Sequence, residues 1–253
     1  MNPVLRIIWF YPDILNLQGD RGNVMALERV CRTAGIEPQV VRVNRLEDEF
    51  SLDGAGVVLL GPGELAVMPA VLEALGPRHD EFAALVDQGA LMLVSGTSAA
   101  LVARQTRRVD GTVIPGLGLL DLDVSERETI IGDDLILKVG PQELHGMQIR
   151  LTDLKLVEGT STEVFGEIVY GFGNDSAHPG VEGARRRNLI ATNLLGPLLV
   201  KNPWFTWTLV NELVVGPDHN TPSPTWPMEE RAAHAQRSFC ASKPVAQGTV
   251  RTL

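Results

Sequence analysis

Two short turns in the first half of the chain combine small residues in a pattern that could support chemistry. One turn is Leu60-Gly61-Pro62-Gly63-Glu64 and the other is Val94-Ser95-Gly96-Thr97-Ser98, and each follows an apolar run. In open α/β sheets, ligands bind at the carboxyl ends of the strands, where the strands turn into helices. The two turns are therefore candidate parts of one binding or catalytic site, although the same composition also suits a simple tight connection.

The two cysteines do not suggest a reactive centre. Cys31 lies on an apolar stripe with helical spacing, which indicates a small buried core residue, and Cys240 lies far away in the sequence. Their number and spacing match neither a metal site nor a disulfide framework. We therefore predict no metal ion and no cofactor.

The charge balance argues against two classes of partner. The formal net charge is -9 at pH 7, and the densest basic cluster, Arg185–Arg187, is predicted to be a solvated loop. Binding to nucleic acid or to an anionic membrane needs a basic face, so we expect neither. The first apolar run, Leu5–Tyr11, has the length of a strand, and no stretch reaches the roughly 18 apolar residues of a membrane span. We predict a cytoplasmic protein without membrane insertion.

The elements that must position the two turns follow from the apolar pattern. Continuous apolar runs at Leu5–Tyr11, Gly56–Leu60 and Ala90–Val94 are typical of strands that are buried on both faces. Segments with helical spacing lie between them, and further elements are expected at 24–34, 39–43, 65–75 and 81–86. Strands that alternate with helices predict an α/β fold with a mostly parallel sheet flanked by helices.

The second half of the chain differs from the first. It is predicted to contain shorter strands or strand-bearing loops, at 113–124, 128–139, 164–171 and 188–193, and a final helix at Pro203–Val215. From Gly216 the composition changes to Pro, Ser and Thr. We therefore divide the chain into a domain over 1–216 and a C-terminal appendage over 217–253, with a short helix at Met228–Phe239 and a mobile tail.

Four segments, in a fixed order, resemble the GatD family, the glutamine amidotransferase subunits of lipid II isoglutaminyl synthase. Tyr11–Asn23 is similar to the family's Pro-Asp-x-x-Asn-x-x-Gly-Asp-x-Gly-Asn entry into its first helix. Gly111–Asp121 is similar to its Gly-Leu-Gly-Leu-Leu-Asp segment, and Gly171–Asn174 also fits. Ala191–Pro197, followed by Lys201-Asn202-Pro203, is similar to Thr-Tyr-Leu-His-Gly-Pro and its Lys/Arg-Asn.

This resemblance implies a fold, an activity and a partner. The family belongs to the cobyric-acid-synthase-like class I glutamine amidotransferases, and the resemblance covers roughly residues 5–215. Family members hydrolyse glutamine and pass the ammonia to a Mur-ligase-like partner, which uses ATP to amidate D-glutamate in the peptidoglycan precursor. A cysteine thiolate attacks the carboxamide, a histidine moves protons, and backbone N–H groups hold the oxyanion.

The catalytic positions of the family carry other residues in this chain. An ungapped alignment places Gly96 at the position of the cysteine, and a shift of one residue would place Ser95 there. Leu195 stands at the position of the histidine, because Gly196-Pro197 fix the register. At the glycine turn, Pro62 replaces a residue that could donate an N–H. We expect Gly96 and Leu195 to lie side by side in a vestigial pocket formed by Gly61, Pro62, Gly63, Thr97 and Ser98.

Three functions remain open. The first, which we predict, is a non-hydrolysing GatD-like subunit that forms a heterodimer with a Mur-ligase-like, ATP-dependent enzyme. The second is an active glutaminase in which Ser95 or Ser98 is the nucleophile and His145, in a predicted loop before Gly146, is the base. The third is a stand-alone protein that binds another small molecule in the former glutamine pocket. The second is disfavoured because loss of either catalytic group can lower turnover by about 10⁶.

Overall fold

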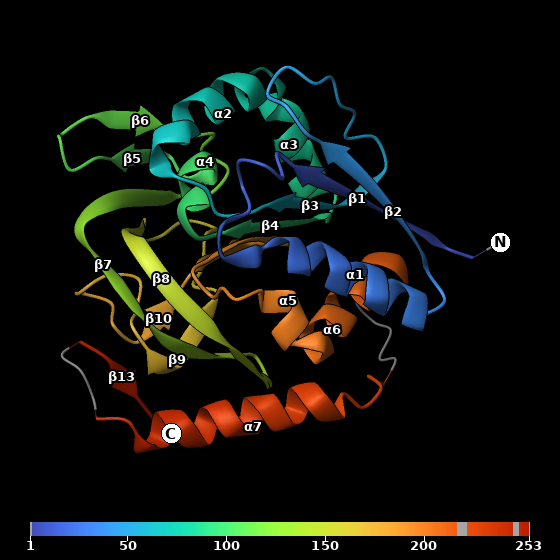
Figure 1. The fold of residues 1–253 in the computed structure, drawn as a ribbon. Helices are drawn as coiled ribbons and strands as arrows, with labels where there is room; N and C mark the ends of the chain where they lie inside the picture. Colours follow the sequence, from blue (N-terminus) through green and yellow to red (C-terminus); the bar gives the residue numbers. More distant parts are fainter. Residues whose placement is uncertain (1, 217–221, 245–247, 253) are drawn as a thin grey trace.

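A six-stranded sheet forms the centre of the computed structural model, which describes residues 2–216, 222–244 and 248–252 (Figure 1). All neighbouring strands in this sheet are parallel except the pair at one edge. The predicted, mostly parallel sheet is thus confirmed. In spatial order its strands are β11 (Ala184–Arg186), β12 (Leu189–Thr192), β4 (Leu91–Ser95), β3 (Ala55–Leu60), β1 (Val4–Phe10) and β2 (Glu37–Val43).

Helices cover both faces of this sheet, as predicted (Figure 1). Successive side chains of a strand point to opposite faces, so both must be apolar when both faces are covered. In β1, Ile8 packs in the cluster with α2 and α3, whereas Ile7 packs in the cluster with α1 and α6. The helices of the first face are α2 (Met68–Leu75), α3 (His79–Asp87) and α4 (Ala99–Val102), and those of the second are α1 (Arg21–Thr33), α5 (Leu198–Lys201) and α6 (Pro203–Val214).

A second, mainly antiparallel sheet is built around one long hairpin. Its arms are β7 (Leu122–Val139) and β8 (Gln142–Leu156), so the prediction of short strands or loops here was wrong. The buried face of β8 carries polar residues such as Gln148, Arg150 and Thr152, which explains why its apolar pattern is weak. The other strands are β5 (Gln105–Arg107), β6 (Val113–Pro115), β9 (Gly166–Gly171), β10 (Val181–Glu182) and β13 (Val250–Arg251).

The basic cluster Arg185–Arg187 is not the solvated loop that the sequence predicted. Its first two residues belong to the edge strand β11. The Arg186 guanidinium donates to the carbonyl oxygen of Leu119 at 3.1 Å and forms an ion pair with Asp87 at 3.2 Å. Charged side chains on an edge strand are a common protection against unwanted strand pairing.

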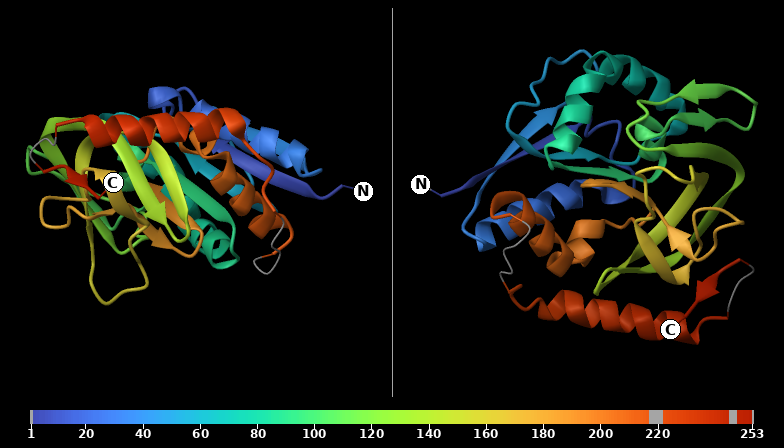
Figure 2. Two further views of the ribbon diagram at one scale, coloured as in Figure 1. Left: turned by 90° about the horizontal axis from the view of Figure 1, so that it is seen from below. Right: turned by 180° about the vertical axis from the view of Figure 1, so that it is seen from behind.

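The C-terminal segment contains the predicted helix, which is longer than expected. Helix α7 (Pro227–Ser242) runs along the outside of the molecule in all views (Figures 1 and 2). Where the sequence predicted a mobile tail, β13 pairs with β9. Residues 217–221, 245–247 and 253 of the predicted appendage lie outside the described residues.

Candidate functional site

The two turns that the sequence singled out meet at one cavity of about 380 Å³. The first turn contributes Pro62 and Gly63, the second contributes Gly96 and Thr97, and Leu195 closes the wall between them. The remaining wall includes residues of the β7–β8 hairpin and mixes aliphatic with polar side chains. The aliphatic residues are Leu17, Leu65, Ala66, Ile130, Ile149 and Leu151, and the polar ones are Gln18, Glu64, Arg108 and Glu126. The cavity therefore lies where strands of the parallel sheet end, as expected for this class of fold.

Gly96 forms a sharp elbow between β4 and the following helical turn. Its φ of +58° lies in the left-handed region, which glycine adopts without strain. A Cβ atom at this position would lie 3.1 Å from Cβ of Pro62 and 3.7 Å from Cδ2 of Leu195. Gly96 and Leu195 are thus neighbours, as the sequence predicted. A strained strand-to-helix elbow is the geometry that presents a nucleophile in hydrolases of α/β type, but here it presents no side chain.

Ser95 and Ser98 are both turned away from this cavity. Ser95 is the last residue of β4, is 1% exposed and hydrogen-bonds to the Asp20 carboxyl group. Ser98 is 0% exposed and donates to the carbonyl oxygen of Gly61 at 2.6 Å. Neither hydroxyl lines the cavity, so neither is placed to attack a ligand bound there.

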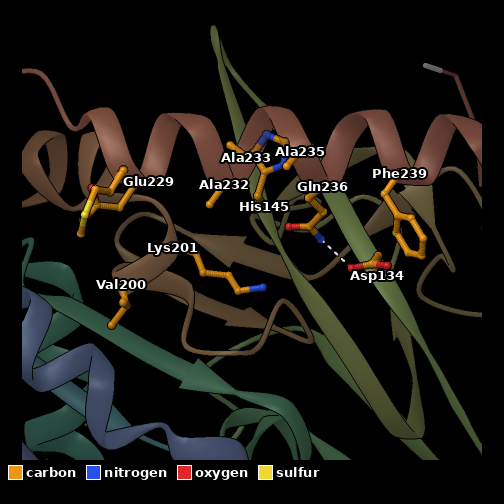
Figure 3. Close-up of a pocket in the computed structure, with 11 residues that line it drawn as sticks. Asp134, His145, Val200, Lys201, Glu229, Ala232, Ala233, Ala235, Gln236 and Phe239 are labelled. Atoms are coloured by element: carbon orange, nitrogen blue, oxygen red, sulfur yellow. Dashed lines mark hydrogen bonds between the residues drawn. The ribbon is translucent and has the colours of Figure 1, made fainter.

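His145 lies in strand β8 and not in the predicted loop, and it does not join the two serines. It lines a different cavity, beneath α7 (Figure 3). Met147, which pairs with Leu195, lies between His145 and Ile149 along the strand. The proposed Ser–His pair is therefore wrong, because the extended conformation of β8 carries His145 past the end of the first cavity.

The two central residues of the first turn, Pro62 and Gly63, have no free backbone N–H that could donate to an oxyanion. Pro62 has no N–H, and its carbonyl oxygen accepts a hydrogen bond from Leu17 N–H at 2.9 Å. The Gly63 N–H donates to the Thr97 hydroxyl at 3.2 Å, and that hydroxyl donates back to the Gly63 carbonyl oxygen. The side chain of Thr97 thus occupies the donor that an active site would leave available.

Asp20 is a buried carboxyl group beside the cavity that sequence reasoning missed. It is 6% exposed and accepts a hydrogen bond from Asn23 Nδ2 at 2.8 Å. Burial raises the pKa of Asp20 to about 7, although the hydrogen bonds from Ser95 and Asn23 oppose the shift. A Cβ atom on Gly61 would lie 2.7 Å from Asp20 Oδ2, so the glycine permits this close approach. The only signal in the sequence was the Gly-Asp-x-Gly-Asn pattern of this segment.

Neither of the two cysteines is placed to act as a nucleophile. Both are 0% exposed, and Cys31 packs in the cluster that contains α1 and α6, as predicted. Burial raises the pKa of the Cys31 and Cys240 thiols to about 11. Only the thiolate is a strong nucleophile, so these thiols are unreactive near neutral pH.

Solved structures with similar architecture define the class of fold. A structure described as a glutamine amidotransferase matches with a TM-score of 0.52 and 20% identity, over 81% of this chain and 97% of that chain. A glutamine amidotransferase from Thermotoga maritima matches with a TM-score of 0.50 and 13% identity, over 91% of this chain and 92% of that chain. The fold is that of the class I glutamine amidotransferases.

Sequence comparison adds a more specific relationship. Subunit GatD of lipid II isoglutaminyl synthase (glutamine-hydrolyzing) from Staphylococcus aureus is 24% identical over 198 residues, which are 78% of this chain and 79% of that protein. The subunit of the same name from Streptococcus pneumoniae is 23% identical over 209 residues, or 81% of this chain and 79% of that protein. No family model matches the chain. The predicted resemblance is confirmed, and this chain is a homologue of GatD subunits.

Proposed function

We propose that this protein is a non-hydrolysing GatD-like subunit, which keeps the amidotransferase fold without its glutaminase activity. The observation that carries the proposal is the contact between Gly96 and Leu195 at the elbow after β4. In this proposal Gly96, and not Ser95, holds the former nucleophile position, since Gly96 alone has the left-handed φ and faces the cavity. Leu195 holds the former base position.

A rebuilt glutaminase finds little support in this geometry. A new nucleophile would need an exposed hydroxyl or thiol with a base within hydrogen-bond reach. Ser95, Ser98 and the two cysteines are buried, and His145 lines another cavity. The stand-alone alternative has one supporting observation: the cavity of about 380 Å³ has the size of a small-molecule site.

The proposed partner is a Mur-ligase-like, ATP-dependent enzyme that forms a heterodimer with this chain in the cytoplasm. The relatives are named as subunits of lipid II isoglutaminyl synthase, which motivates a second subunit and a role in peptidoglycan precursor amidation. The partner would use free ammonia or another amine as its nucleophile. Separately, no helix in the described ranges combines the length and apolar character needed to cross a bilayer.

The proposed contact surface surrounds the vestigial pocket. Leu17, Ile130 and Ile149 line this pocket and are 42%, 65% and 39% exposed. Exposed apolar side chains that cluster at a pocket rim are typical of protein interfaces. A stable complex of this kind buries about 800 Å² on each partner.

We expect Ile130→Glu to weaken the complex with the ligase from the same genome by roughly 30-fold or more, since an apolar residue at the centre of an interface contributes about 2 kcal/mol. Val4→Glu is the matched control. Val4 is 59% exposed and begins β1, so it lies at the opposite end of the parallel strands from the pocket. Analytical ultracentrifugation with and without nucleotide measures the effect.

No association of the wild-type proteins at micromolar concentration would contradict the proposed partnership, and equal weakening by both variants would contradict the proposed surface.

A further inference from the structure

A second cavity, of about 590 Å³, lies between α7 and the body of the protein (Figure 3). It is separate from the vestigial pocket, because the two share no lining residue. Apolar side chains form much of its wall, and the helix contributes small ones; the apolar residues are Val200, Met228, Ala232, Ala233, Ala235 and Phe239. Volumes between about 300 and 1,000 Å³ are typical of sites for small organic molecules.

Polar contacts, more than apolar packing, hold α7 over this cavity. Among the described residues of α7, Cys240 is the one that is buried, so the helix has little apolar packing against the body of the protein. Near the start of α7, Glu229 forms an ion pair with Arg29 of α1 at 2.7 Å. Farther along, Gln236 donates to Asp134 at 2.9 Å, and just past the helix Lys243 pairs with Asp133 at 2.7 Å. These contacts hold α7 at both ends, and the cavity between them remains open.

The charges around the cavity leave one cation without an ion-pair partner among the described residues. Asp134 pairs with Lys243 at 2.6 Å, a cation that it shares with Asp133, and Glu229 pairs with Arg29. Lys201, at the end of α5, extends into the space beneath α7 (Figure 3), and no ion pair within the described ranges involves it. An unpaired ammonium group on an apolar wall is suited to an anionic head group.

His145 forms part of the cavity wall and offers no free hydrogen-bond donor to an anion. Its side chain lines the cavity and is 6% exposed, and its Nε2 lies 3.0 Å from Glu143 Oε1. Because a carboxylate only accepts, Nε2 carries the proton of this contact. Burial lowers the pKa of His145, so the ring is neutral and Nδ1 is an acceptor. Nδ1 is buried and has no hydrogen-bond partner in the described part of the chain. An ionised carboxylate cannot donate to this acceptor, so Lys201 provides the polar contact for an anionic head group.

We propose that this cavity is a binding site for a small amphiphilic carboxylate. The carboxylate group pairs with Lys201, and the apolar body lies against Val200, Met228 and Phe239. A site of this kind is independent of the glutamine chemistry of the fold, since it uses α7 and not the elbow at Gly96. Because Lys201 is the cation without an ion-pair partner in the part of the cavity wall that the structure describes, the site is expected to bind an anionic head group more tightly than a cationic one.

Titration calorimetry of the full chain with octanoate tests this site. We expect saturable binding to the wild type, and a loss of about tenfold in affinity in Lys201→Met, because a charge-assisted hydrogen bond is removed. Ala233→Phe, which fills the cavity and leaves the charge in place, is expected to abolish binding. Lys138→Met is the matched control, since Lys138 is exposed on β7 and does not line this cavity. Circular dichroism establishes that each variant is folded.

Three outcomes would overturn the proposal. The first is the absence of saturable octanoate binding at millimolar concentration. The second is equal affinity of Lys201→Met and Lys138→Met for octanoate, and the third is binding of octan-1-ol or octylammonium as tight as that of octanoate. None of these outcomes depends on whether the protein hydrolyses glutamine or binds a ligase.

Discussion

The double variant Gly96→Cys/Leu195→His is expected to release ammonia from glutamine at least about 10²-fold more slowly than an active GatD subunit. Each single variant is expected to remain at background, because nucleophile and base act as a unit and loss of either can lower turnover by about 10⁶. The double variant still lacks the oxyanion donors of the glycine turn, since Pro62 has no N–H and the N–H of Gly63 is bonded to Thr97.

Ammonia release by these variants is measured beside the Staphylococcus aureus relative, each with its own ligase. A thiol-directed glutamine analogue would show whether the new cysteine is accessible. A cysteine at 96 must adopt a φ of +58° and displace Pro62 slightly, so thermal unfolding of each variant is the folding control. Turnover in Gly96→Cys alone would contradict the assignment of Leu195 to the base position.

Asp20→Asn is expected to change how stability depends on pH. The folded-state pKa of Asp20 is about 7, above the 3.8 of a solvent-exposed aspartate, so the folded state holds the proton more tightly than the unfolded state. The contribution of Asp20 to the free energy of unfolding is therefore fully present below pH 4, and it is lost as the pH rises towards 7. The shift of about three pKa units corresponds to roughly 4 kcal/mol, of which the wild type should lose roughly 3 kcal/mol between pH 5 and pH 8. The asparagine variant should lack this loss, because it has no proton to release.

Urea unfolding at pH 5 and pH 8 measures the free energy of unfolding for both proteins. Asp13→Asn is the matched control, because Asp13 lies in the same segment but is exposed. The difference between wild type and Asp20→Asn should change with pH, whereas the difference for Asp13→Asn should not. A parallel pH dependence in all three proteins would show that Asp20 is ionised in the folded state throughout this range.

The parallel sheet could be predicted from the sequence because its strands are buried on both faces. Runs such as 56–60 and 90–94 are apolar at nearly every position, and this pattern does not depend on distant residues. Strand β8 could not be predicted in the same way. Its inward positions hold Gln148, Arg150 and Thr152, whose partners come from other segments, so no apolar alternation marks the strand.

The parts of the candidate site that a sequence motif aligns could be predicted. The parts whose pKa or position depends on tertiary contacts could not. Gly196-Pro197 located Leu195, whereas the ungapped alignment gave Gly96 and left Ser95 open. The structure places Gly96 beside Leu195. The pKa of Asp20 depends on burial beside Gly61, far away in sequence, which no local pattern shows. The position of His145 depended on recognising β8, and this error produced the incorrect Ser–His pair.

The central claim is that this subunit does not hydrolyse glutamine, and ammonia release by its complex with the cognate Mur-ligase-like enzyme tests it most directly. The complex is supplied with ATP, the ligase substrate and either glutamine or ammonium chloride. We predict amidation with ammonium chloride, and no glutamine-dependent ammonia above the rate without protein. A glutamine-dependent rate well above background that disappears in Ser95→Ala or Ser98→Ala would contradict the account.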